Sequence, residues 1–210
     1  LLVRGSERSD ISMNYKYQLK TKGVFSRKKE GNCELSYEQK DSVLTIRVNR
    51  NDQKFNGVSI VSENSKLEFN VPQNIDVKMK SDLGDIDVSG LKANTTNLYT
   101  SLGDITAKNI SGNIDLHTAH GDISMNELAG KINSATSLGD IQGENILISD
   151  NSKFNTSLGD IDVQLGNPIS ECSLDLSSSL GKIKVDRPDL KKKSSSQLNI
   201  GNGKLKVIMQ

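Results

Sequence analysis

Five aspartates are the residues of this chain whose type and spacing most clearly suggest chemistry. Each follows a glycine and precedes an isoleucine, and they recur at intervals of 18 to 20 residues: Asp85, Asp104, Asp122, Asp140 and Asp160. If the segments that carry them stack on one another, the carboxylates form a ladder whose neighbours lie about 5 Å apart. Such a ladder attracts cations, so it is a candidate interaction face.

The ladder does not resemble a calcium site. Calcium takes six to eight oxygen ligands, and calcium-binding repeat proteins supply them from a Gly-Gly-x-Gly-x-Asp nonapeptide. Each unit of this chain offers one carboxylate at the corner and lacks the double glycine. We therefore expect no metal site and no cofactor, and we expect each aspartate to bond groups of its own turn.

The histidines do not form a catalytic or metal-binding pair. His117 and His120 are the only two in the chain. His120 occupies a position held by leucine in most other units, so it is expected to be a substituted core residue, whereas His117 is expected to point outward. The sequence contains no Gly-x-Ser-x-Gly, His-Glu-x-x-His or phosphate-binding loop. We expect no catalytic residues and no enzyme.

The aspartates belong to a repeat that organises most of the chain. The motif Leu-Gly-Asp-Ile, or a variant of it, occurs at Leu83–Ile86, Leu102–Ile105, His120–Ile123, Leu138–Ile141, Leu158–Ile161, Leu180–Ile183 and Asn202–Leu205. Successive glycines are separated by 19, 18, 18, 20, 22 and 22 residues. A fixed glycine with a period near twenty is typical of stacked units that bury their apolar faces against their neighbours.

Residues alternate between two faces on both sides of each glycine. In one unit the inward positions are Leu98, Thr100 and Leu102 before the glycine, then Ile105 and Ala107 after it. The inward phase steps by three across the Gly-Asp pair, where a continuous strand would step by two, so the pair must form a corner. The Ser or Thr three residues before each of the first six glycines is expected to bond its equivalent in the next unit.

These patterns predict the fold class. A second turn is indicated midway through several units, at Val88–Gly90, Ile110–Gly112 and Leu128–Gly130, and no segment shows a helical apolar stripe. We predict an all-β fold, a parallel β-solenoid or β-roll of about seven Gly-Asp-Ile coils with an irregular β N-terminal cap. The isoleucines after the corners should form one buried column. The handedness stays open.

Length and composition favour one continuous domain. Only 34% of the residues are hydrophobic and 4% aromatic, which suits a narrow aliphatic core. Most aromatic residues precede residue 70, where the motif is absent, so residues 10–75 are expected to form irregular coils and a cap, and residues 76–210 the regular stack. Leu1–Ser6 resembles the remnant of a protease-cleavable tag, so residues 1–9 are expected to lie outside the fold. The last strand is expected to run on from the last repeat.

Charge and cysteine content narrow the classes of partner. The net charge of +1 does not favour a nucleic-acid partner. Cys33 and Cys172 lack the spacing of a metal site; two buried free thiols are expected, and a disulfide stays open. Lysine replaces the corner aspartate at Lys182 and Lys204, so the corner is expected to run from acidic to basic. The chain is expected to be a monomer or to associate weakly head to tail.

The Ser/Thr-x-Leu-Gly-Asp-Ile units resemble an adhesin-type family of bacterial envelope proteins with a toast-rack β-repeat fold, a domain of unknown function related to head-GIN domains. The resemblance covers about residues 40–208 and is strongest from Asp82 to Val163. It implies an exported or membrane-tethered repeat stack, so we expect an extracytoplasmic location, in the periplasm or at the cell surface. It brings no functional residues to this chain. The sequence itself contains no transmembrane stretch or signal peptide.

Residues and resemblance together favour a non-catalytic structural or protein-interaction module, adhesin-like, of the bacterial cell envelope, with a protein or envelope surface as its partner. Envelope-stress signalling, carbohydrate binding and a glycan-degrading solenoid enzyme stay open as alternatives. An enzyme would need a concave groove with clustered acids and a basic partner, and saccharide grooves commonly use aromatic platforms. The repeats contain only Tyr99 and Phe154 as aromatic residues.

Overall fold

A computed structural model of the chain describes residues 1–22, 33–50, 60–168, 172–177, 181–187, 190–194, 197–200 and 205–209. Within these ranges, side chains are described for residues 1–16, 35–48, 66–168, 181–184 and 208. All regular elements in this part of the chain are β-strands, so the all-β prediction is confirmed. None of the described residues provides a helix that could cross a membrane.

Contacts divide the chain into two compact units. One unit comprises residues 1–13 and 68–210 and contains the repeats, and the other comprises residues 14–67. The second unit contains an antiparallel hairpin of β3 (Cys33–Lys40) and β4 (Val43–Arg50). It also contains most of β2 (Ser12–Lys22) and the first part of β5 (Ile60–Pro72), which are neighbours in a sheet. The side chains of Cys33 and Cys172 lie outside the part of the chain whose side chains are described, so the expected free thiols and the possible disulfide both remain predictions.

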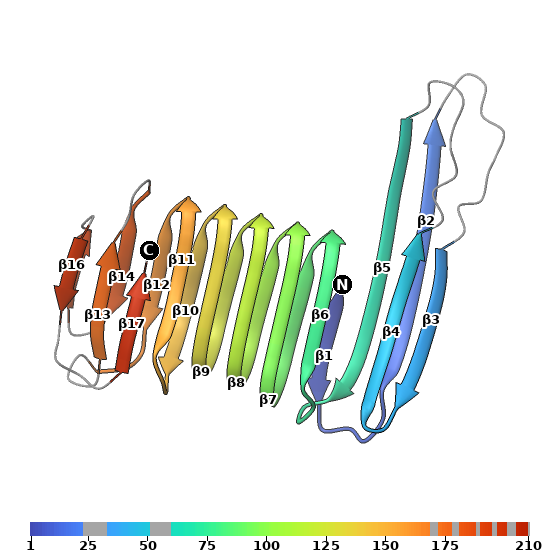
Figure 1. Ribbon diagram of the computed structural model, residues 1–210, viewed down its shortest axis with the longest axis horizontal. Coiled ribbons are helices and arrows are strands. Elements are labelled where there is room, and N and C mark those ends of the chain that lie inside the picture. The colour runs from blue at the N-terminus through green and yellow to red at the C-terminus, as the bar shows by residue number, and fades with distance from the viewer. Residues whose placement is uncertain are drawn as a thin grey trace. The chain divides into compact units, whose positions relative to one another are not determined.

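The compact unit that contains the repeats is a parallel β-solenoid, as predicted (Figure 1). Strands β7 (Ile86–Leu102), β8 (Ile105–His120) and β9 (Ile123–Leu138) each run through almost a whole coil. They pair in parallel, with each residue opposite its equivalent one repeat later, as in Ile86–Ile105 and Ile105–Ile123. The period of 18 to 20 residues therefore corresponds to one turn of the solenoid.

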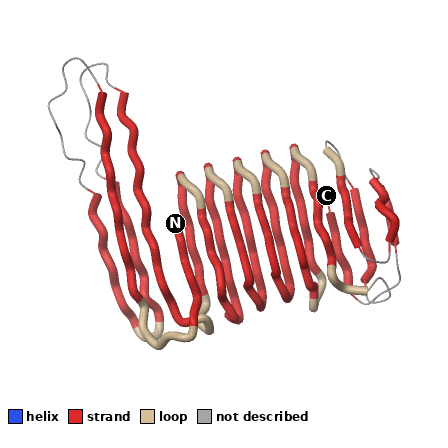
Figure 2. Tube along the Cα trace, turned by 180° about the vertical axis from the view of Figure 1, so that it is seen from behind, coloured by secondary structure: helices blue, strands red, loops and turns tan. Residues whose placement is uncertain are grey.

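Each coil has two sides, which meet at the Gly-Asp corner. The side that follows the corner, here called the post-corner side, continues from the first half of β9 into β10 (Ile141–Ile148), β12 (Ile161–Leu165) and β14 (Ile183–Arg187). The side that precedes the corner, the pre-corner side, begins at β6 (Val77–Leu83) and continues through the second halves of β7, β8 and β9 to β11 (Ser152–Leu158). Figure 2 shows the corners as loops along one edge of the stack.

The core is the narrow space between the two sides. The predicted isoleucine column is confirmed, because Ile86, Ile105, Ile123, Ile141, Ile161 and Ile183 are at most 2% exposed. Leucine or isoleucine at the second turn, as in Leu91, Ile110 and Leu128, forms another fully buried column. Each coil contributes one residue to each column, so the core of a coil is completed by its neighbours.

The leucines directly before the corner glycines are not in the core, contrary to the sequence-based expectation. Leu83, Leu102, Leu138 and Leu158 are 67%, 47%, 41% and 47% exposed. His120 in the same column is exposed too, so it is not a substituted core residue. The inward alternation ends at the Ser or Thr two residues earlier, and the backbone has already begun to turn when it reaches the leucine. Leu180 lies outside the described residues.

The second turn also differs from the expected one. A residue with positive φ recurs six positions after the first four corner glycines, at Gly90, Asn109, Glu127 and Asn145, with φ between 50° and 73°. The register pairs the flanking residues of Gly90 with those of Asn109, not with those of Gly112. Turns were expected at Ile110–Gly112 and Leu128–Gly130. Their glycines, Gly112 and Gly130, lie instead in a separate, later bend, with φ of 123° and 139°. Asparagine adopts the left-handed region more readily than most residues, so Asn109 and Asn145 were the signal in the sequence for this turn.

We had expected residues 1–9 to lie outside the fold, and this expectation was wrong. Residues Leu2–Ser6 form β1, which pairs in parallel with β7 on one side and with Glu68–Pro72 of β5 on the other. Leu2 and Val3 are buried. The segment has two successive apolar residues and enters the post-corner side in repeat register, with Val3 opposite Val88. It therefore supplies one rung of the stack.

The C-terminal end does not continue as two further regular coils, so the solenoid has about five turns where about seven were expected. Strand β15 (Leu190–Ser194) runs antiparallel to β14, and β16 (Gln197–Ile200) runs antiparallel to β13 (Cys172–Ser177). The last strand, β17 (Leu205–Met209), lies between β11 and β13 and is parallel to both. The chain therefore reverses after β14, and the two antiparallel strands cover the edges that a stack leaves open.

The isoleucine column provides a direct test of the stack. We expect Ile123→Ala to lower the free energy of unfolding by about 2 to 5 kcal/mol, because the side chain is fully buried and neighbouring coils limit collapse of the cavity. Leu138→Ala is the matched control at an exposed position and should cost less than about 1 kcal/mol. Urea unfolding followed by circular dichroism measures both. Equal costs for the two substitutions would contradict the stacking.

Candidate functional site

The corner is built around glycine for two independent reasons. The corner glycines have positive φ, for example 144° at Gly103 and 149° at Gly121, where a side chain adds strain. A Cβ at Gly121 would also lie 2.1 Å from the carbonyl oxygen of Gly103 in the preceding coil. The same clash recurs at Gly139 and Gly159, at 2.1 Å and 2.0 Å. A corner can therefore stack closely on the preceding one only when it carries glycine itself.

We had expected each corner aspartate to bond groups of its own turn, but each one bonds the next coil. The Oδ1 atom of Asp85 accepts a hydrogen bond from the backbone N–H of Asp104 at 2.9 Å. Asp104 does the same for Asp122, and Asp122 for Asp140, each at 2.8 Å. Asp140 then accepts from the N–H of Asp160, and Asp160 from that of Lys182, each at 2.7 Å. The five carboxylates thus form one chain of bonds between coils.

The hydroxyl column also differs from the expected ladder. The hydroxyls of Thr100, Thr118, Thr136 and Thr156 do not bond one another, as had been expected, but donate to the corner glycine of the preceding coil, at 2.9 to 3.1 Å. The first three of these threonines are buried. The glycine carbonyl thus supplies each of these hydroxyls with an acceptor.

The corner therefore satisfies all its backbone groups through neighbouring coils. The Gly103 N–H donates to the carbonyl of His120 in the next coil at 3.0 Å, and its carbonyl accepts the Thr118 hydroxyl. The Asp104 carbonyl accepts the N–H of Ile86 at 2.9 Å. Its N–H, like the Gly103 carbonyl, has no backbone partner, and the carboxylate of the preceding aspartate accepts it.

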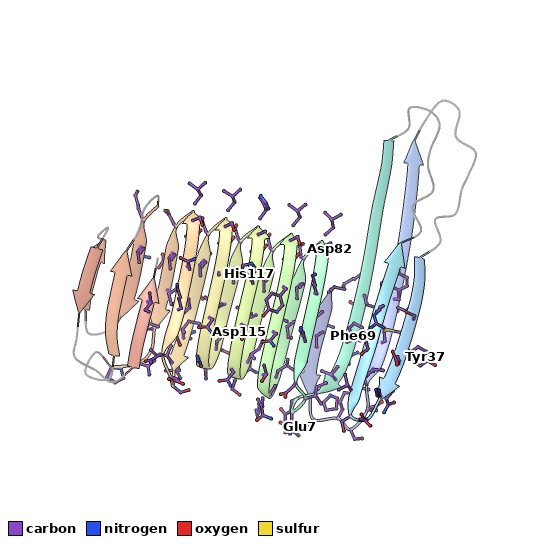
Figure 3. All side chains as sticks on the ribbon, viewed as in Figure 1. Glu7, Tyr37, Phe69, Asp82, Asp115 and His117 are labelled. Atoms are coloured by element: carbon purple, nitrogen blue, oxygen red, sulfur yellow. The ribbon has the colours of Figure 1, made fainter. Side chains whose placement is uncertain are left out.

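Two exposed rows lie side by side along these corners. The leucine ridge comprises Leu83, Leu102, Leu138 and Leu158, with His120 completing the column. Figure 3 shows a row of side chains that project beyond the corners. The acidic row comprises the five aspartates, all exposed except the half-buried Asp140. One row precedes each glycine and the other follows it. The structure thus brings the predicted acidic residues together and adds the leucines, which sequence analysis had assigned to the core.

The outer face of the pre-corner side carries polar and aromatic side chains, among them His117, which points outward as expected. Asn133 donates to the Asp115 carboxylate at 2.8 Å, and the rings of Tyr99 and His117 lie 6.2 Å apart between centroids. His117 lies on this face (Figure 3). His120 pairs with Leu102 and Leu138 in the ridge, so the two histidines do not converge. No group of three or more His, Cys, Asp or Glu side chains within the described residues could hold a metal ion.

The change from acid to base is visible at one corner. Lys182 is exposed and its backbone N–H ends the chain of aspartate bonds. Next to it, Lys184 forms an ion pair with Asp162 of the preceding coil. The pairing neutralises part of the predicted charge gradient within the stack. The side chains of Lys204 and Lys206 lie outside the described residues.

Comparisons with known proteins identify a family and no individual relative. A family model described as Toastrack DUF4097 matches the chain over two overlapping stretches, residues 3–114 and 37–207. These stretches include both the strands of residues 14–67 and the corners of the repeat stack. No curated protein and no solved structure matches the chain.

The aspartate bonds predict a difference between two substitutions at one corner. Asp122→Ala removes the acceptor for the Asp140 N–H and should lower the free energy of unfolding by about 1 to 2 kcal/mol. Asp122→Asn keeps an oxygen acceptor and removes one carboxylate from the row, so it should remain within about 0.5 kcal/mol of the parent chain. Thermal or urea unfolding measures both. Equal losses for Ala and Asn would mean that the bond between coils contributes nothing.

Proposed function

The chain belongs to the Toastrack DUF4097 family, and on that premise we propose that it is a non-catalytic, adhesin-like protein-interaction module of a bacterial cell envelope. We propose further that the leucine ridge and the acidic row together are its interaction surface. The partner is a protein surface with apolar side chains in a line beside basic ones.

The exposure of the leucine ridge is the observation that carries this proposal. Leucines at 41% to 67% exposure recur at one position of successive coils, and the fold does not need them for its core. Rows of exposed large apolar side chains are typical of interaction sites on soluble proteins. Each leucine directly precedes a corner held by bonds to its neighbours, so the row is ordered before binding and little backbone entropy is lost on association.

The acidic row selects the charge of the partner. Five carboxylates next to an apolar ridge favour lysine or arginine on the facing surface and disfavour an acidic one. The same charges disfavour two ridges of this protein packing against each other, because that contact would bring two acidic rows together. The row thus contributes specificity and the leucines contribute buried area.

The carboxylates support the non-catalytic part of the proposal. Each corner aspartate has one oxygen committed to a backbone N–H of the next coil, which is a structural role. The location outside the cytoplasm, with a tether to the membrane, rests on the resemblance to envelope proteins and is part of the same proposal.

The test uses an array of defined synthetic peptides and purified protein. Retained peptides should be rich in apolar residues flanked by lysine or arginine, and binding should weaken with salt as charges are screened beyond about 10 Å at 0.1 M. The double variant Leu102→Ser/Leu138→Ser should lose about tenfold in affinity while keeping the fold, because it removes buried apolar area.

Leu147→Ser is the matched control, because Leu147 is an exposed leucine, at 49%, that lies away from the corners. It should bind the same peptides as the parent chain. Peptide selection without a basic or apolar preference, or equal binding by the ridge variant and the Leu147→Ser control, would exclude the ridge as the interaction surface.

A further inference from the structure

Two neighbouring columns of outward side chains cross the pre-corner side, and neither the core nor the ridge uses them. Residues at equivalent positions of parallel strands lie about 4.8 Å apart and so form a column. The two columns lie on β7, β8 and β9, two residues apart along each strand: Tyr99, His117 and Ala135 in the first, and Asn97, Asp115 and Asn133 in the second. Figure 3 shows Asp115 and His117 on this face of the stack. The two columns together are here called the outer strip.

The first column of the outer strip provides an aromatic surface. The rings of Tyr99 and His117 lie 6.2 Å apart between centroids and are tilted by 52°, which is within the range of packed aromatic pairs. Tyr99 is half-buried and His117 is exposed. On β9 the neighbour of His117 in this column is Ala135, so the column continues there with only a methyl group. The strip therefore leaves ring surface accessible to a ligand.

The second column provides hydrogen-bonding groups that the fold orients without using all of them. Asn133 donates to Oδ1 of Asp115 at 2.8 Å, which orients the carboxylate, and no described residue bonds its other oxygen. The amide oxygen of Asn97, Oδ1, is buried and has no hydrogen-bond partner among the described residues. A buried acceptor without a donor costs free energy. The Asn97 amide therefore gains a bond when it turns this oxygen toward a donor from outside the protein.

The charges at the outer strip disfavour a charged ligand of either sign. Lys78 and Lys80 of β6 lie beyond the strip on one side and Lys153 of β11 lies beyond it on the other, all exposed. Asp115 is the one acidic residue of the strip. A cationic ligand would meet lysines at both margins, and an anionic ligand would meet the Asp115 carboxylate at the centre. A neutral ligand with many hydroxyls avoids both penalties, because each hydroxyl can donate to the carboxylate or to an amide oxygen.

We propose that the outer strip binds a neutral glycan chain. Its pyranose rings pack on Tyr99 and His117, because the negative face of an aromatic ring attracts polarised C–H groups. Its hydroxyls bond the carboxylate and the two amides of the second column. The register of β7, β8 and β9 is unbroken across these residues, so the site lies on a rigid sheet and is ordered before binding. The site is separate from the corners and independent of the function proposed for the leucine ridge.

The probes are linear tetramers of glucose, N-acetylglucosamine and mannose, each labelled with an uncharged fluorophore. Fluorescence anisotropy with the purified protein should show saturable binding of at least one of them, with a Kd below about 1 mM. Tetramers of galacturonic acid and of glucosamine have the same ring shape but carry negative and positive charge. They should bind about tenfold more weakly than the neutral tetramer, because the carboxylate and the lysines disfavour them.

Two variants of the outer strip change outward side chains and leave the core intact. His117→Ala removes one ring and should raise Kd about tenfold. Ala135→Glu places a long charged side chain beside the imidazole and should abolish measurable binding. Gln142→Ala is the matched control, because Gln142 is exposed on the post-corner side, and it should bind like the parent chain. The ridge variant Leu102→Ser/Leu138→Ser should also bind the neutral tetramer like the parent chain.

Amide chemical shifts of the unmodified protein provide a second measurement that needs no variant. Titration with the neutral tetramer should shift the amides of residues 97–99, 115–117 and 133–135, and leave those of the corner aspartates unchanged. The proposal would be overturned by the absence of saturable binding of every neutral tetramer or by tighter binding of a charged one. It would also be overturned by unchanged binding in both strip variants, by loss of binding in the ridge variant, or by shifts confined to the corners.

Discussion

The hydrogen bond from each corner aspartate to the backbone N–H of the next corner is the interaction on which the rest of the structure depends. The parallel ladder leaves this one N–H without a backbone acceptor, and the preceding carboxylate supplies it. Two carboxylates about 5 Å apart repel by roughly 0.8 kcal/mol in water, whereas a hydrogen bond to a charged group contributes about 1.5 to 3 kcal/mol. The bond outweighs the repulsion, so an acidic row is a stable way to stack corners.

The same corner explains why the surface carries a leucine ridge and why the ends differ. Glycine allows the close stacking, the threonine hydroxyl satisfies its carbonyl, and the leucine between them is left outside. At the C-terminal end the chain covers its edges with the antiparallel strands β15 and β16. At the other end β6 lacks a strand beyond it among the described residues. The surface proposed for interaction thus arises from one repeated motif.

The sequence was sufficient to predict what repeats. The glycine period and the phase step across Gly-Asp predicted a parallel solenoid and its isoleucine column, because every repeat has its buried residues at the same positions. It could not predict the partner of a side chain between coils: Asp104 and Thr118 fit a bond within a turn or between hydroxyls equally well by pattern alone. The leucines were assigned to the core because alternation does not reveal where a strand stops. The strand β1 and the position of β17 between β11 and β13 were missed because terminal segments insert by pairing over long sequence distances.

Amide hydrogen exchange at the corners tests the central claim most directly. The N–H groups of Asp104, Asp122, Asp140 and Asp160 have a carboxylate acceptor, whereas that of Asp85 has none among the described residues, so the chain contains its own control. Measured residue by residue by NMR, the four amides should exchange far more slowly than that of Asp85, because each is hydrogen-bonded to the carboxylate of the preceding coil. Exchange of Asp122 and Asp140 as fast as that of Asp85 would contradict the account.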